Sequence, residues 1–227
     1  MKQYYQIKYG IGDELGTPYS LNLHGTPEYR KSIKETIEDN TVLQLDKIQF
    51  KIDTRTGTGK KRLGNIVYWQ LGDPFAHVLI ISKAILKIFE QFQIPYYSIY
   101  RAQILNEKEF GEYFILHLAG DVFDEIDYSQ QNFLLKDIET WKLNENSVAR
   151  KFSNKIEFLK NREGLIATQN QTLFFKKIIY KDEYDIFWGW PVSILVSEEV
   201  KSAIEAAKLS GVSFELFTEY EIEFSND

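Results

Sequence analysis

The chain has 227 residues, of which 44% are hydrophobic and 26% are charged, and its formal net charge is −6. A chain of this length and composition can bury a core without disulfides. Because it has no cysteine, thiolate metal sites and cysteine nucleophiles are excluded. The acidic balance argues against nucleic-acid binding, which needs a basic face, and favours basic partners. No apolar run approaches the roughly 18 residues of a membrane span, so we expect a cytoplasmic protein that binds no membrane.

The first 72 residues predict a β-rich N-terminal segment. Residues 1–10 alternate polar and apolar side chains, as a half-buried strand does. Residues 11–27 contain several glycines and prolines and predict a loop, whereas residues 42–53 and 63–71 predict strands. We therefore separate a segment 1–72 from a region 73–227, which we expect to form one continuous globular unit.

The region 73–227 contains two similar strand-helix-strand units. In the first unit an apolar run ends at Ser82, a segment of helical period follows, and a β-branched and aromatic run begins near Tyr96. The second unit repeats this order around Ser197, and its last run begins at Val212. Each serine is suited to cap the helix that follows it. We predict an α+β fold with a mixed or largely antiparallel sheet, two related strand-helix-strand units and a β-rich N-terminal extension.

The remaining segments predict mainly short strands. The aromatic and β-branched runs favour strands, and turn residues separate them. The expected strands are 97–104 and 112–118 as an antiparallel pair, then 173–179, 184–190 and 213–224. Between them, residues 137–143 and 156–165 predict short strands or edge elements.

The sequence contains no recognisable arrangement of catalytic residues. His24, His77 and His117 are far apart and lack the spacing of a metal motif. A Gly-Thr-Gly-Lys stretch at residues 57–60 lacks the first glycine and the hydroxyl residue of a phosphate-binding loop. There is no nucleophile elbow and no dinucleotide fingerprint. We therefore predict no catalytic residue, no cofactor and no metal site, and we expect a protein that is not an enzyme.

Acidic and aromatic clusters are the candidates for binding a partner. Carboxylates gather between residues 121 and 127 and at the turn before residue 184, and each group could equally be a solvated turn. Tryptophan is a common interface anchor, and two tryptophans lie on the same side of an extended stretch, where core packing is the alternative. The candidates are Asp121, Asp124, Glu125, Asp127, Asp182, Glu183, Trp188 and Trp190.

Several stretches resemble the immunity protein 11 family of bacterial polymorphic toxin systems. They are Ile81–Ile104, Glu112–Leu118, Asp121–Tyr128 and Leu195–Phe217. The family is similar in its Val-Ser-Glu helix start, here at Ser197, in the Gly-Val-x-Phe strand that follows, and in an Ile-Asp segment ending at Asp127. The resemblance covers roughly residues 65–220. Lys83 and His117 depart from it, since the family has an acid and an asparagine at these places.

The resemblance implies inhibition by binding. Such proteins neutralise a cognate toxin domain by capping or distorting its active site, and have no catalytic residues of their own. Toxin domains of these systems are often nucleases with basic sites, which an acidic inhibitor can approach rapidly. Two alternatives stay open. One is an enzyme whose site is assembled from the scattered histidines and a carboxylate. The other is a non-catalytic adaptor that adds a partner strand to an open sheet edge.

Overall fold

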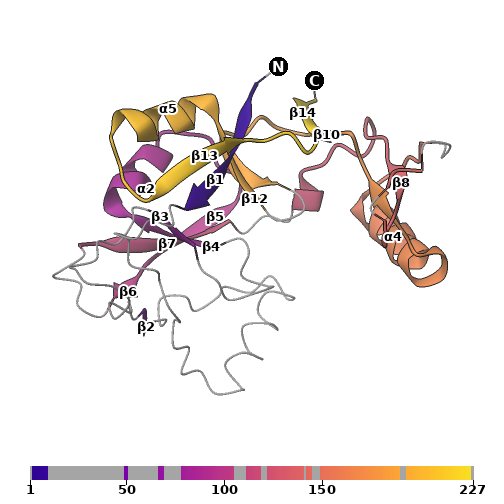
Figure 1. Ribbon diagram of the computed structural model, residues 1–227, viewed down its shortest axis with the longest axis horizontal. Helices are drawn as coiled ribbons and strands as arrows, with labels where there is room; N and C mark the ends of the chain where they lie inside the picture. The colour runs from indigo at the N-terminus through magenta and orange to yellow at the C-terminus, as the bar shows by residue number, and fades with distance from the viewer. Residues whose placement is uncertain are drawn as a thin grey trace. The chain divides into compact units, whose positions relative to one another are not determined.

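The computed structural model confirms the predicted α+β class. It describes residues 2–9, 49–50, 66–68, 78–104, 111–118, 122–140, 142–144, 149–189 and 193–225. Most of its strands pair antiparallel, and helices lie between some of them along the chain (Figure 1). Within these ranges, no helix has both the length and the apolar character needed to cross a bilayer.

The chain divides into two compact units, and each is described by itself. Unit 1 comprises residues 1–3, 120–183 and 216–227, and unit 2 comprises residues 4–119 and 184–215. In sequence, residues 120–183 of unit 1 therefore lie between the two parts of unit 2, and the other two segments of unit 1 flank them. The division between residues 1–72 and 73–227 stays a prediction, because most of residues 10–65 lies outside the described ranges.

The first sheet of unit 2 is built around the first predicted repeat. Its order is β3 (Ile66–Tyr68), β4 (Val78–Ser82), β7 (Tyr113–Leu118) and β5 (Tyr97–Arg101). All three pairings are antiparallel, and that of β5 with β7 was predicted. Helix α2 (Lys83–Phe89) follows β4 directly and packs on β4 and β7. Beside this sheet, β2 (Gln49–Phe50) pairs parallel with β6 (Gln103–Ile104).

The second sheet of unit 2 contains the second repeat. Its order is β11 (Ile186–Gly189), β12 (Ser193–Ser197), β1 (Tyr4–Tyr9) and β13 (Val212–Leu216). Helix α5 (Glu198–Ala206) follows β12 and packs on β12 and β1. The two helices α2 and α5 also pack against each other (Figure 1). The two repeats therefore meet within one unit.

Both repeats begin their helices in the same way. The backbone of Ser82 has φ −68° and ψ 160°, and that of Ser197 has φ −69° and ψ 163°. Each hydroxyl accepts a hydrogen bond from the amide three residues later, at 3.3 Å from Ile85 and 3.4 Å from Val200. These bonds satisfy an amide that the first helical turn would leave unpaired. The predicted capping role of both serines is confirmed.

The equivalence of the repeats extends to β1 and β7, which were predicted as strands but not as corresponding parts of the two repeats. A buried tyrosine faces each capping serine, because Tyr113 of β7 pairs with Ser82 and Tyr4 of β1 pairs with Ser197. In the second sheet β1 thus takes the place that β7 has in the first. The strand that pairs with the second repeat at this place, β1, precedes the first repeat in the sequence.

The described residues of unit 1 form two small sheets and one long helix. Strand β8 (Leu134–Asp137) pairs antiparallel with β9 (Gln171–Phe174), on which α4 (Lys155–Gln169) packs. Strand β10 (Lys177–Tyr180) pairs parallel with β14 (Glu221–Phe224). A single 3-10 turn, η2 (Val122–Asp124), precedes the segment that runs beside β10.

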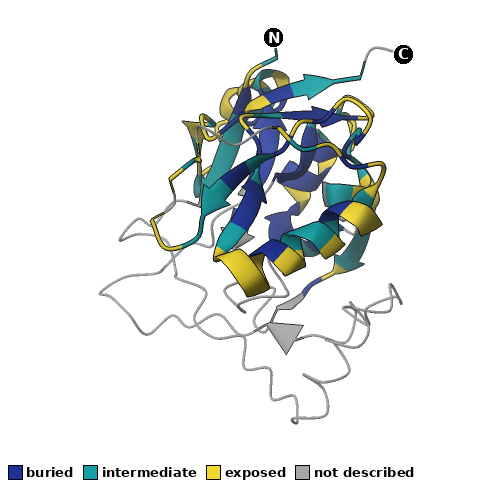
Figure 2. Cartoon of the chain, turned by 90° about the vertical axis from the view of Figure 1, so that its right-hand side faces the viewer, coloured by how far each residue is buried: buried dark blue, intermediate teal, exposed yellow. Residues whose placement is uncertain are grey.

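Aromatic rings form the core of unit 1. Phe133 is fully buried, and its ring centroid lies 4.7 Å from Phe158, 5.3 Å from Phe152 and 6.0 Å from Tyr128. Figure 2 shows buried residues in dark blue, interspersed with exposed residues along the helices and strands. Offset and tilted ring pairs at these separations add to the hydrophobic gain of burial.

The prediction for residues 156–165 is wrong, because these residues belong to α4. Only Phe158 and Leu165 of this helix are buried, so its sequence has no wide apolar stripe to indicate a helix. Side-chain caps stabilise the start of α4, although its apolar pattern is weak. The Asn154 side chain accepts from the Glu157 amide at 3.0 Å, and the Glu157 carboxylate accepts from the Ser153 amide at 2.7 Å.

Two predicted strands are each split in the structure. Residues 173–179 contain a break between β9 and β10, and residues 213–224 contain a break between β13 and β14. Of the described residues in the predicted strand 137–143, Asp137 ends β8 and Leu143 forms an isolated bridge to Lys136. A continuous run of apolar and aromatic residues shows where strands lie but not where the chain changes direction.

Candidate functional site

The structure brings together the acidic candidates from two distant segments of unit 1. Ile126 bridges to Tyr180, and the Asp127 amide donates to the Ile179 carbonyl at 2.8 Å. The Lys181 amide in turn donates to the Glu125 carbonyl at 2.8 Å. The segment around residue 125 therefore lies beside the end of β10. We call Asp124, Glu125, Asp127, Asp182 and Glu183 the acidic group of unit 1.

Three lysines partly neutralise the acidic group. Lys155 Nζ lies 2.8 Å from Asp124 Oδ1, and Lys2 Nζ lies 2.7 Å from Glu183 Oε1. Lys181 Nζ donates to the backbone carbonyl of Asp124. Five carboxylates and three ammonium groups leave an excess of two negative charges. The side chains of Asp124 and Glu183 are 54% and 58% exposed, so their pairs are surface pairs that an incoming partner can reach.

The carboxylate of Asp127 accepts hydrogen bonds from other residues of the chain. Its carboxylate accepts from the Ser129 amide at 3.0 Å, the Ser129 hydroxyl at 2.6 Å and the Gln130 side chain at 2.9 Å, and also from the Ser225 hydroxyl. These bonds, led by the hydroxyls of Ser129 and Ser225, lower the pKa of Asp127 from 3.8 to about 2. Asp127 thus ties its own turn to the residue after β14, which is a structural role.

We expect Asp127→Asn to lower stability at neutral pH and to remove a pH dependence. Because the folded-state pKa is depressed, the carboxylate stabilises the fold fully above about pH 5, and this contribution is lost as the pH falls towards 2. Asp127 is only partly buried, so solvent screening reduces the contribution to roughly 1 kcal/mol. Urea unfolding from pH 7 to pH 2 measures it. If the free energy of unfolding of the variant depended on pH as that of the parent does, Asp127 would not have this role.

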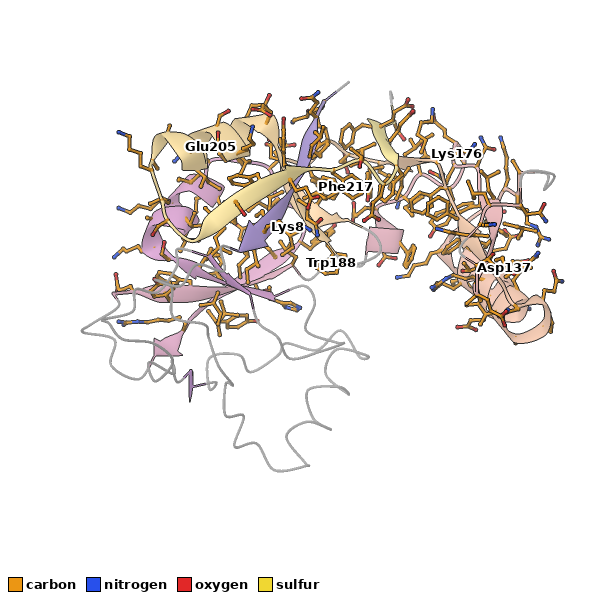
Figure 3. All side chains as sticks on the ribbon, viewed as in Figure 1. Lys8, Asp137, Lys176, Trp188, Glu205 and Phe217 are labelled. Atoms are coloured by element: carbon orange, nitrogen blue, oxygen red, sulfur yellow. The ribbon has the colours of Figure 1, made fainter. Side chains whose placement is uncertain are left out.

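Of the two tryptophan candidates, the structure describes Trp188, which is buried. Trp188 lies in β11 of unit 2 (labelled in Figure 3), where it is 5% exposed and every residue of the strand is buried. Its ring therefore packs in the core of unit 2, which was the alternative interpretation. Trp190 and Asp121 lie outside the described residues.

Of the three histidines, His117 lies within the described ranges. His117 lies in β7, half-buried, and pairs with Val78 of β4 and Ser98 of β5. His24 and His77 lie outside the described ranges. Among the described residues, no group of three or more histidine, aspartate or glutamate side chains is placed to hold a metal ion.

The side-chain amide of Gln131, which no sequence pattern indicated, links the segment after the acidic residues to β10. Gln131 is 1% exposed, its Oε1 accepts from the Ile179 amide at 2.8 Å, and its Nε2 donates to the Lys177 carbonyl at 2.7 Å. Gln131 thus extends the hydrogen bonding of β10 beyond its ladder. A single glutamine in a polar segment carries no signal of this role, because its partners are 46 and 48 residues away.

Comparisons with known proteins add no relative. No protein-family model matches the chain, and no curated protein matches it.

Proposed function

We propose that this chain is an immunity protein that binds and neutralises the toxin domain of a bacterial polymorphic toxin. The observation that carries the proposal is the acidic group of unit 1. Its members come from two segments more than 50 residues apart, 124–127 and 182–183, and all were candidates for binding a partner. Carboxylates exposed on one side of a unit attract a basic surface and speed its approach.

The residues that carry the family resemblance have framework roles, which fits this proposal. Ser197 caps α5 and is fully buried, and Ile126 is fully buried in its bridge to Tyr180. Asp127 fastens a turn. Proteins that share such a framework can differ in the exposed residues that select a partner. The resemblance therefore supports a shared scaffold, and the acidic group supports the kind of partner.

Blocking the toxin's active site is the mechanism that we propose. A basic site that binds phosphate is the natural target of an acidic surface, because the carboxylates occupy the positions of the phosphates. The exposed carboxylates contribute mainly to the rate of association, since each is solvated before binding.

Co-expression tests the proposal. The proposal predicts that a gene beside this chain's gene encodes the toxin domain. That domain is expressed in a sensitive bacterium with and without the chain, and survival is counted. We expect rescue by the parent chain. No rescue, with both proteins folded and expressed, would refute the pairing.

A charge comparison tests the role of the acidic group. We expect Glu125→Gln with Asp182→Asn to slow association about tenfold at low salt and to weaken its salt dependence. The matched control is Glu199→Gln with Glu205→Gln, which removes two exposed carboxylates from α5 of unit 2. Stopped-flow association rates measure both. Equal rates for the two variants would show that the acidic group does not steer binding.

A further inference from the structure

Two exposed tyrosines lie where the chain runs from α2 into β5 of unit 2 (Figure 1). Tyr96 is 75% exposed and Tyr97 is 42% exposed. The other large hydrophobic residues of β5, Ile99 and Tyr100, are half-buried. The two adjacent rings are therefore open to solvent, and a partner can reach them.

The fold does not require aromatic residues at this place. The sheet orders β3-β4-β7-β5 and β11-β12-β1-β13 match strand for strand, so β13 of the second repeat corresponds to β5 of the first. Strand β13 begins at Val212, and Gly211 precedes it. The second repeat thus enters the corresponding strand with a glycine and a valine. Because exposed rings also gain no burial energy, the architecture does not account for Tyr96 and Tyr97.

Hydrogen bonds fix the backbone that leads into the two tyrosines. The Gln93 carbonyl accepts from the amides of Asp185 at 2.8 Å and Ile186 at 3.2 Å, and the Gln93 amide donates to the Asp185 carboxylate at 3.0 Å. Pro95 restricts the next part of the chain, and from Tyr97 onward β5 pairs with β7. A tyrosine on a fixed backbone loses only two side-chain torsions when it binds, so the entropic cost of docking is small.

The immediate surroundings of the tyrosines are acidic. Between residues 88 and 100 the only charged side chain is that of Glu90, and the hydrogen bond to Gln93 adds the carboxylate of Asp185. Lys87 and Arg101 lie outside this stretch, on the preceding helical turn and at the far end of β5. Aromatic rings beside carboxylates complement a basic surface.

Unit 2 itself shows how a tyrosine ring and a carboxylate together bind a cation. Lys201 Nζ lies 4.3 Å from the centroid of the Tyr5 ring and 3.0 Å from Glu198 Oε1. The ring attracts the ammonium group through its quadrupole, and the carboxylate attracts it through its charge. Tyr96 and Tyr97 present the same kinds of group to a side chain of a partner.

We propose that Tyr96 and Tyr97 bind a lysine or arginine side chain on the surface of a basic protein domain. The inference rests on the proposed function and deepens it, because the partner is the toxin domain of that function and the tyrosines anchor one of its cations. This surface lies wholly in unit 2. An aromatic anchor mainly slows dissociation, whereas long-range charge mainly speeds association.

The test measures the Kd and the dissociation rate of the full-length chain with a catalytically inactive form of the toxin domain. The first variant is Tyr96→Ser with Tyr97→Val, in which valine is the residue of the second repeat. We expect its Kd to rise about tenfold, mainly through dissociation. The matched control is Val212→Ala, at the corresponding place in the second repeat, which should bind within about threefold of the parent.

Two further variants separate the aromatic face from apolar area alone. Tyr96→Phe with Tyr97→Phe keeps both rings, and we expect a Kd within about threefold of that of the parent. Tyr96→Leu with Tyr97→Leu keeps apolar surface but has no ring to attract a cation, and we expect its Kd to rise about fivefold. Circular dichroism checks that all variants are folded.

The outcomes distinguish this inference from the proposed function. If the parent chain does not bind the toxin domain, the proposed function fails and this inference fails with it. If the parent binds and the serine and valine variant binds equally well, the function stands and the tyrosine site is refuted. If the leucine variant binds as tightly as the parent, the tyrosines contribute only apolar surface, and the binding of a cation is refuted.

Discussion

Replacing Phe133 by alanine should lower the free energy of unfolding of unit 1 by about 3–5 kcal/mol. Phe133 is fully buried, and its ring contacts Phe152, Phe158 and Tyr128 at centroid separations of 4.7 to 6.0 Å. Removing the ring leaves a cavity between β8 and α4, and the loss includes the contacts of the neighbouring rings. A domain is stable by only about 5–15 kcal/mol, so this loss is a large fraction of the total.

Hydrogen exchange measured by mass spectrometry can show which unit loses stability when Phe133 is replaced. We expect faster exchange in β8, β9 and α4 and unchanged exchange in β4 and β7. Phe133→Leu, which keeps most of the volume, should cost less than about 1.5 kcal/mol. Equal loss of protection in both units would show that the aromatic cluster is not the core of unit 1 alone.

Tyr4→Ala and Tyr113→Ala should destabilise the chain by similar amounts, about 3 kcal/mol each. The two tyrosines are 3% and 5% exposed, and each faces the serine that caps the helix of its repeat. Tyr4 also packs edge-on against Phe187 with ring centroids 5.2 Å apart, and its hydroxyl donates to the Tyr184 carbonyl at 2.7 Å. If the repeats are equivalent, the strand at the N-terminus contributes as much to its sheet as β7 does to the other.

Neighbouring substitutions provide the controls. Tyr5→Ala removes a more exposed ring that lies 4.3 Å beneath Lys201 Nζ, and should lower stability much less than Tyr4→Ala does. Tyr4→Phe keeps the ring but leaves the Tyr184 carbonyl without its donor, which should cost about 1 kcal/mol. Urea unfolding of the full-length variants measures all four. If Tyr4→Ala left stability unchanged, β1 would not be an integral strand of unit 2.

The parts of the fold that local chemistry determines could be predicted. The serine caps of α2 and α5 depend on residues three positions apart, and the pairing of β5 with β7 joins neighbouring segments. The pairing of β1 with β12 joins residues more than 180 positions apart, and no local pattern indicates it. Helix α4 was missed because it buries only two side chains, so its apolar period is weak.

The sequence indicated which residue types form the candidate site, but not what each residue does there. Carboxylates near residues 125 and 182 were identified as exposed charges, whereas their proximity depends on how β10 runs beside residue 126. The structural role of Asp127 depends on Ser225, 98 residues away. Trp188 was a candidate for binding a partner but is buried. The sequence could not separate these roles, because an aromatic residue in a strand suits a core and an interface equally well.

Isothermal titration of the purified full-length chain into the toxin domain encoded beside its gene tests the central claim most directly. We predict a saturable one-to-one complex with a Kd in the nanomolar range or below, which corresponds to at least about 12 kcal/mol of binding free energy. Loss of toxin activity should follow the same stoichiometry. No binding heat and no inhibition, with both proteins folded, would contradict the claim that this chain acts by binding that toxin.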